Sequence, residues 1–231
     1  MSEHEPEPAQ AREPDYVAST RLVFDRTADL YVELVGTSIT PRYETAIDRA
    51  ALDTFAEMVL TRGGGAVLDV GCGTGRATSY LAERGLNIGG TDLSLAMIEK
   101  ARLAHPDLRF DEGSLTKLPA ADSALVGAVY WYSIIYTPLD QLSAVWTELK
   151  RVLQVDGTVL VAFQAGENER VERKDVHGSA ADLVVFRHSL DDVAASLSDA
   201  GFDVNVRIHR EPDLDHETTP QAFLLAEPTA G

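Results

Sequence analysis

One short segment constrains the fold more than any other, because it joins an apolar strand to a helix through three closely spaced glycines. The segment VLDVGCGTGR spans residues 67–76 and places glycines at positions 71, 73 and 75. Residues 66–70 are apolar and too few for a helix, which is typical of a buried parallel strand. Glycines permit positive φ and let the backbone approach a ligand closely. The segment therefore predicts a ligand-binding turn at the carboxyl end of a strand.

A carboxylate further along the chain makes this pattern more specific, since a glycine turn alone also fits a plain strand-to-helix connection. Asp92 closes the next apolar run, residues 87–91, roughly 20 residues after the turn, where a carboxylate can accept both hydroxyls of a ribose. Asp69 lies two residues before the first glycine. Its charge would repel a pyrophosphate and attract the ammonium of a methionine moiety. These residues favour a nucleoside with a cationic amino acid part over a nicotinamide dinucleotide.

Strand and helix patterns alternate through the rest of the chain. Predicted strands cover 66–70, 87–91, 108–110, 125–130 and 157–163, and predicted helices cover 75–84, 94–104, 139–152 and 189–200. Such alternation is typical of a parallel sheet with helices on both faces. The last two strand-like runs, 202–208 and 223–226, have no helix between them, which predicts an antiparallel pair. We predict an α/β, Rossmann-like, doubly wound and mostly parallel sheet of seven strands with an antiparallel last strand.

Composition excludes several kinds of partner. Lys and Arg total 20 against 37 Asp and Glu, and this formal net charge of -17 disfavours nucleic acid and anionic membranes. The single cysteine, Cys72, excludes an intramolecular disulfide and favours a reducing compartment. The histidines form no metal-ligand spacing with carboxylates, so we expect no metal. The sequence has no apolar run long enough to span a membrane and no signal-peptide pattern, so we expect a cytoplasmic protein. We expect it to be a monomer or a homodimer.

Several segments resemble a known family. VLDVGCGTGR and TDLSLAMI resemble the first two motifs of class I S-adenosylmethionine-dependent methyltransferases. Within that family the sequence is similar to the small-molecule members whose domain is called methyltransferase domain 11 or 25. FDEGSLTKLPAADSALVGAVYWYSIIY resembles the later motifs, ELKRVLQVDGTVLVAF the fifth-strand unit and AGFDV the sixth strand. The resemblance covers most of residues 16–227. It implies S-adenosylmethionine as cofactor, S-adenosylhomocysteine as product and a small-molecule acceptor.

The resemblance also implies a domain organisation. Residues 1–14, rich in Glu and Pro, are expected to be a disordered tail. Helical periodicity predicts an N-terminal helical lid over 15–62. Residues 63–231 would be the S-adenosylmethionine-binding methyltransferase domain. A densely charged insertion near 165–187, with a short strand at 183–186, is expected to lie over the ligand crevice.

The resemblance implies a set of cofactor contacts. The methionine part would contact Asp69, Gly71, Cys72, Gly73 and Gly75, and the ribose would contact Asp92. The adenine would contact Leu93, Met97, Ser114 and Leu115. The sulfonium would lie beside Trp131 and Tyr132. An aromatic face beside the sulfonium would attract its positive charge. Ser114 stands where the family often has Asp. Cys72 is expected to pack under the cofactor and not to act as a nucleophile.

The catalytic residues are less constrained by the sequence. Tyr136 stands where the related subgroup often has His, and tyrosine, with an ordinary pKa near 10, is a poor base at neutral pH. The candidates for accepting a proton are Tyr136, His177 in the charged insertion and Tyr31 in the lid, and each also fits a structural role. In-line methyl transfer can depend on positioning alone. The sequence leaves O-, N- and C-methylation open, and also leaves open a cofactor-binding protein of this fold that transfers no methyl group.

Overall fold

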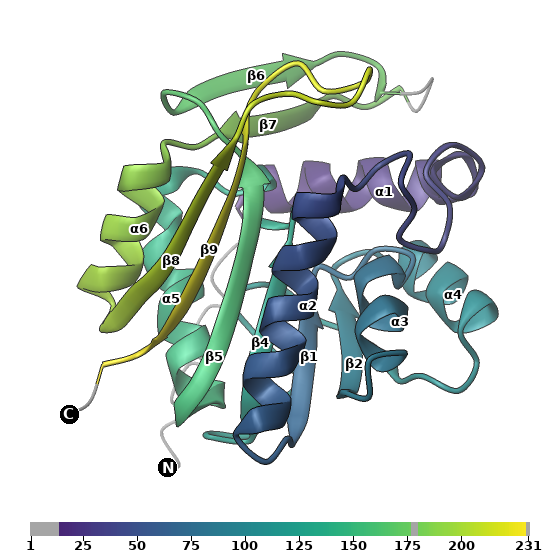
Figure 1. Ribbon diagram of the computed structural model, residues 1–231. Coiled ribbons are helices and arrows are strands. Elements are labelled where there is room, and N and C mark those ends of the chain that lie inside the picture. The colour runs from purple at the N-terminus through teal and green to yellow at the C-terminus, as the bar shows by residue number, and fades with distance from the viewer. Residues whose placement is uncertain (1–13, 177–179, 230–231) are drawn as a thin grey trace, which may run out of the picture.

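The computed structural model describes residues 14–176 and 180–229, and it contains one seven-stranded sheet in the order β3-β2-β1-β4-β5-β9-β8 (Figure 1). The strands are β1 Ala66–Val70, β2 Asn87–Asp92, β3 Phe110–Glu112, β4 Leu125–Trp131, β5 Leu153–Gln164, β8 Phe202–Arg210 and β9 Gln221–Pro228. The pairs from β3 to β5 are parallel, whereas β9 is antiparallel to both β5 and β8. The predicted doubly wound sheet with an antiparallel last strand is confirmed.

Six α-helices and two short 3-10 helices accompany this sheet in the described part of the chain. They are α1 Asp15–Leu34, α2 Ala46–Thr61, α3 Arg76–Ala82, α4 Leu95–Ala104, η1 Ile134–Tyr136, η2 Leu139–Gln141, α5 Leu142–Val152 and α6 Leu190–Asp199. None of the described helices is long and apolar enough to cross a membrane. The expected tail over 1–14 falls outside the described residues, except for Pro14.

Two apolar clusters pack the sheet on its two faces. On one face α2 lies close against β4, where a Cβ added to Gly127 would stand 2.9 Å from Phe55 and 3.1 Å from Val59. On the other face Trp146 of α5 is fully buried, and its indole Nε1 donates to Ser196 Oγ of α6 at 2.9 Å. Apolar burial of this kind provides the main free energy of folding. It also fixes the strand ends from which the site is built.

Several predicted boundaries were wrong by a few residues. The strand expected at 108–110 begins at Phe110, because residues 105–108 form a turn in which Leu108 N donates to the His105 carbonyl at 3.1 Å. The helix expected over 75–84 begins at Arg76 because Gly75 is left-handed, with φ +82°. The helix expected over 139–152 starts as the 3-10 turn η2 behind Pro138.

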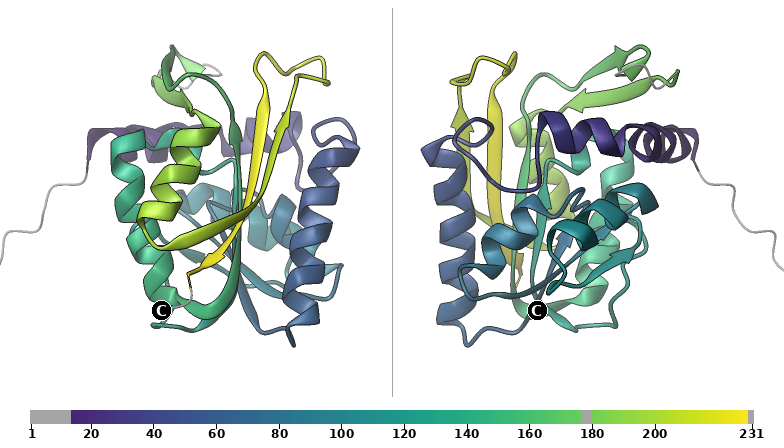
Figure 2. Two further views of the ribbon diagram at one scale, coloured as in Figure 1. Left: turned by 60° about the vertical axis from the view of Figure 1, so that its left-hand side comes forward. Right: turned by 90° about the vertical axis from the view of Figure 1, so that its right-hand side faces the viewer.

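Within the charged insertion near 165–187, two described segments form regular structure. β6 Glu169–Arg173 pairs antiparallel with β7 Leu183–Arg187 to form a separate two-stranded sheet, so the charged run is a strand and not an irregular loop. The ladder accommodates exposed charges because solvent covers both faces of β6. Figures 1 and 2 show this hairpin and α1 above the carboxyl ends of the central strands.

Candidate functional site

A cavity of about 630 Å³ lies beyond the carboxyl ends of β1, β2 and β4, and residues of α1 form part of its wall. β1 has β2 on one side and β4 on the other, so the cavity lies where the winding of the sheet reverses. Open α/β sheets bind ligands at this topological switch point. The fold alone therefore makes this cavity the candidate site.

The glycine turn after β1 is held tightly against the end of β2. Gly71 N and Cys72 N both donate to the Thr91 carbonyl, at 2.8 and 3.0 Å. Gly73 N donates to Asp92 Oδ2 at 2.8 Å, while Ser94 N donates to the other oxygen of the same carboxylate at 2.9 Å. The Asp92 carboxylate therefore orients both the turn and the start of α4.

Glycine is required at two positions of the turn for different reasons. Gly71 has φ +76°, and a Cβ there would collide with the Cβ of Ser133. Gly73 has φ +54°, and the space where its Cβ would stand is open. Both residues line the cavity. The turn thus presents bare backbone to whatever occupies the cavity.

Asp69 lies behind the turn and not in the cavity wall. Its side chain is fully buried, and Oδ2 accepts a hydrogen bond from Thr78 Oγ1 at 2.6 Å. Oδ1 is buried and has no partner among the described residues. Burial raises the pKa of this carboxyl to about 7, although the Thr78 hydroxyl opposes the rise and the Asp92 charge adds to it. A buried carboxyl in this condition would be stabilised as an anion by a nearby cation.

Four of the residues that were expected to contact the adenine lie together in the cavity wall. Leu93, Met97, Ser114 and Leu115 all line the cavity. Cys72 does not, and its side chain is buried in a small cluster with Ile98, Ala101 and Phe110. Burial raises the pKa of the Cys72 thiol, which keeps it neutral and unreactive. Gly75 also lies outside the wall, because the space beside its Cα faces His105 and Phe110.

An aromatic wall follows β4. Trp131 and Tyr132 both line the cavity, with ring centroids 5.5 Å apart at 85°, and Phe223 of β9 packs against both. Tyr132 has φ +59°, a left-handed conformation that costs a non-glycine residue of order 1–3 kcal/mol and clusters at ligand sites. The Trp131 Nε1 and Ser133 Oγ atoms are buried without a partner in the described residues. The wall therefore combines aromatic surface with unused hydrogen-bonding groups.

Of the three side chains that were predicted to be catalytic, the structure describes two. Tyr31 of α1 and Tyr136 of η1 both line the cavity, and the ring of Phe24 packs edge-on against each, with centroids 6.3 and 5.2 Å away. Burial raises the pKa of both tyrosines, with only partial opposition from Arg76 at Tyr31 and Arg173 at Tyr136. They are therefore hydrogen-bond donors at neutral pH and not bases. His177 lies outside the described residues.

Part of the cavity wall was not predicted from the sequence. α1 contributes Tyr16, Val17, Thr20 and Phe24, and the start of α5 contributes Ala144 and Val145. The helical periodicity of residues 16–35 was a signal for the first group, since it requires an apolar face to be covered. No sequence signal marks the second group, because the same pattern serves core packing. In residues 14–176 and 180–229, no group of three His, Cys, Asp or Glu side chains is arranged to hold a metal ion.

Comparisons with known proteins agree with this geometry. Residues 67–157 match the family described as a methyltransferase domain. The chain is 34% identical over 133 residues to malonyl-(acyl-carrier protein) O-methyltransferase of Pectobacterium atrosepticum, covering 52% of each protein. It spans about half the length of the first curated relatives that it matches.

Solved structures share the fold over nearly the whole chain. The 4+2 cyclase SpnF has a TM-score of 0.74 at 18% identity, with 94% of this chain and 98% of that chain covered. The 1,6-didemethyltoxoflavin-N1-methyltransferase of Burkholderia thailandensis, crystallised with S-adenosylhomocysteine, has a TM-score of 0.68 at 17% identity, with 97% and 94% covered. At such identities the likeness shows the fold alone.

Fold and site together define a Rossmann-like α/β protein with a ligand-sized cavity at the switch point of its sheet. The turn between β1 and α3 falls inside the segment that matches the methyltransferase domain. Over residues 67–157 the chain is similar to the methyltransferase domain family, and the curated relatives that it matches include methyltransferases.

Proposed function

We propose that this chain transfers a methyl group from S-adenosylmethionine to a small-molecule acceptor. The observation that carries the proposal is the cavity itself, in which the glycine turn, Asp92 and the aromatic wall after β4 meet. This combination offers separate places for an amino acid group, a ribose and a sulfonium. The sequence similarity to malonyl-(acyl-carrier protein) O-methyltransferase, 34% identity over 133 residues, supports the proposal.

The residues present fit this cofactor. The open space beside Gly73 and the bare backbone of Gly71 would admit the methionine part, and the unpartnered Oδ1 of Asp69 would stabilise its ammonium through the turn. Asp92 would accept the ribose hydroxyls with the lone pairs that Gly73 and Ser94 leave unused. Leu93 and Met97 would flank the adenine.

Positioning would account for the reaction. The cofactor would supply a methyl group on a positively charged sulfur, which needs no further activation as a leaving group. The protein would hold the acceptor atom in line with that methyl, so that the new bond forms as the methyl–sulfur bond breaks and the neutral thioether leaves. An acceptor that binds in its ionised form, such as a carboxylate, has no proton to lose in this step. Proximity of this kind can contribute about 7 kcal/mol or more to the rate. Trp131 and Tyr132 would stabilise the sulfonium, with about 0.5–2 kcal/mol for a cation over an aromatic face.

The acceptor side of the cavity favours a molecule with a largely apolar body. Val17, Phe24 and Val145 supply apolar surface, and Tyr136 supplies a hydroxyl. Tyr31 and Tyr136 would donate hydrogen bonds to an acceptor oxygen or nitrogen, since their raised pKa values keep the protons on. We propose that α1 is the lid of this site and that residues 63–231 form the methyltransferase domain.

The proposal extends to partners and location. A formal net charge of -17 supports a small-molecule acceptor over nucleic acid. The single cysteine supports a cytoplasmic location. The chain would act as a monomer or a homodimer.

The experiment is a transfer assay with S-adenosylmethionine labelled on its methyl group and a panel of small apolar acids, phenols and amines. We expect S-adenosylhomocysteine to form together with a labelled organic product. Because a cyclase shares this fold, the fold does not decide the activity. Tight cofactor binding with no labelled product from any acceptor would favour a protein that binds the cofactor without transferring methyl.

A further inference from the structure

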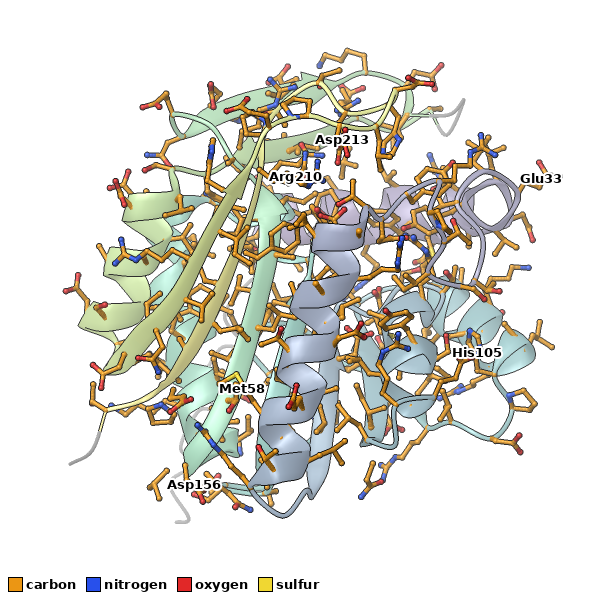
Figure 3. The ribbon with its side chains drawn as sticks, in the orientation of Figure 1. Glu33, Met58, His105, Asp156, Arg210 and Asp213 are labelled. Atoms are coloured by element: carbon orange, nitrogen blue, oxygen red, sulfur yellow. The ribbon has the colours of Figure 1, made fainter. Side chains whose placement is uncertain are left out.

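The linker between α1 and α2, residues 35–45, is fastened to the cofactor half of the molecule. Three successive carbonyl oxygens of the linker each contact a side chain from another element. The pairs are Thr74 Oγ1 donating to Gly36 O at 2.8 Å, His105 Nε2 to Thr37 O at 2.9 Å, and Arg76 Nε to Ser38 O at 3.2 Å. Figure 3 labels His105 on this side of the molecule. The linker therefore lies along the glycine turn, α3 and the end of α4.

Arg76 makes the largest number of these contacts. Its guanidinium forms an ion pair with Glu44 and lies 5.6 Å from the centroid of the Tyr43 ring. Its positive charge also opposes the rise in the pKa of Tyr31 that burial causes. The Arg76 and Glu44 side chains are only 11% and 3% exposed, so removing one partner would leave a nearly buried charge. Arg76 directly follows Gly75, the last glycine of the turn.

α1 is attached to the cofactor half at a second place. Ser94 Oγ donates to Asp25 Oδ1 of α1 at 2.5 Å, and Ser94 N donates to Asp92 Oδ1 at 2.9 Å. One residue therefore contacts both the lid helix and the carboxylate expected to hold the ribose. A further pair, Lys100 with Asp29, is 2.5 Å long, but Asp29 is 92% exposed, so this pair adds little.

We propose that Thr74, Arg76 and Ser94 act as a clasp of positioning residues that couples ligand binding at the turn to the placement of α1 over the acceptor side. The inference rests on the proposed function, because the ligand of the turn is the cofactor named there. Each clasp residue lies within two positions of Gly73, Gly75 or Asp92. A ligand that fixes these groups also fixes the donors that hold α1, and with it Phe24 and Tyr31. The cofactor thereby prepares the acceptor side.

Hydrogen exchange of the full chain tests the clasp with S-adenosylhomocysteine as the probe. In the wild type we expect saturating ligand to slow exchange over residues 15–38 by about tenfold, a typical coupling between two sites. In Thr74→Val, which removes one hydroxyl, exchange without ligand should be about fivefold faster, as for one lost hydrogen bond. Most of the ligand-dependent slowing should disappear while the ligand still binds.

Two further variants separate coupling from general destabilisation. Thr74→Ser keeps the hydroxyl and should restore the ligand-dependent slowing. Arg76→Met removes the ion pair with Glu44 of the linker and should weaken the ligand-dependent slowing. Arg84→Met is its matched control. Arg84 also lies beside α3 and forms an ion pair, but with Asp53 of α2 and not with the linker. Arg84→Met should behave as the wild type. If Arg76→Met does not fold, Thr74→Val carries the test.

Equal ligand-dependent slowing in the wild type, Thr74→Val and Thr74→Ser would overturn the clasp. Failure of the wild type to bind S-adenosylhomocysteine would instead overturn the proposed function. In that case the exchange without ligand still tests the clasp, since equal rates over residues 15–38 in the wild type and Thr74→Val would contradict it.

Discussion

The two sides of the cavity are built in different ways. The cofactor side is centred on the backbone of Gly71 and Gly73 in one turn, together with a carboxylate at the end of the neighbouring strand. The acceptor side consists of side chains from α1, η1 and α5, which are far apart in the sequence. Backbone geometry tolerates few substitutions, whereas side chains on separate elements vary independently. One side therefore defines the cofactor and the other is free to define the acceptor.

The largest expected effect is on the cofactor side. Gly71→Val would place a β-branched side chain at φ +76° and against Ser133. We expect S-adenosylhomocysteine affinity to fall by roughly 100-fold or more, as strain and collision add. Gly64→Val is the control, since Gly64 also has positive φ but nothing lies within 4 Å of the added carbon. Calorimetric titration compares them, and wild-type affinity in Gly71→Val would contradict the role of the turn.

Asp92→Ala should have the next largest effect. The variant removes the acceptor of two backbone hydrogen bonds and the group expected to hold the ribose. We expect about 50-fold weaker binding of S-adenosylhomocysteine, in the range for hydrogen bonds to a charged group. Asp111→Ala makes the same charge change on β3, outside the cavity wall, and should leave the affinity unchanged. Equal affinities in the two variants would refute the ribose assignment.

A change on the acceptor side should leave cofactor affinity alone. Tyr136→Phe removes one hydroxyl that we propose donates to the acceptor, and we expect kcat for methyl transfer to fall by about tenfold. The affinity for S-adenosylhomocysteine should stay within about twofold, because Phe retains the ring packing on Phe24. Tyr130→Phe is the control, since that hydroxyl is buried outside the cavity wall. A loss of cofactor affinity in Tyr136→Phe would contradict the assignment of Tyr136 to the acceptor side.

The smallest expected effect is a pH dependence that arises at Asp69. Its pKa of about 7 in the folded protein means that the carboxyl is half protonated near neutral pH, and the cationic ammonium of the ligand favours the ionised form. Binding should release a proton and tighten by about threefold between pH 6.5 and 7.5. Asp69→Asn should show no such dependence in calorimetric titrations. An identical pH profile in both proteins would exclude Asp69 as its source.

The same raised pKa has a consequence for stability. Between the unfolded value near 4 and the folded value of about 7, the folded protein binds more protons at Asp69 than the unfolded chain. This residue therefore makes the protein less stable as pH rises through that window. Denaturant unfolding of Asp69→Asn should lack this contribution, and an unchanged slope of stability against pH would contradict the assignment.

The glycine turn and the strand end beside it could be predicted from the sequence because their information is local. The glycines at 71, 73 and 75 need particular φ values, and Asp92 ends an apolar strand, so spacing alone placed them together. Local spacing did not distinguish the wall from the layer behind it. Asp69, Cys72 and Gly75 belong to the same turn but face the interior, which depends on packing against Thr78, Ile98 and Phe110.

The acceptor side could be predicted only in outline. Helical periodicity predicted α1. It did not predict that Phe24 would pack between Tyr31 and Tyr136, because Phe24 and Tyr136 are more than 100 residues apart in the sequence. The charged run at 169–173 lacks the apolar alternation that marks a strand, and only its pairing with β7 makes it one. Long-range pairing of this kind leaves no local pattern in the sequence.

Calorimetric titration of the full chain with S-adenosylhomocysteine shows whether the glycine turn and Asp92 bind this cofactor. We expect one site per chain with micromolar affinity, present in Asp111→Ala and weakened by about 50-fold in Asp92→Ala. The absence of binding in the wild type would mean that the glycine turn only connects β1 to α3, and the proposed methyl transfer would be wrong.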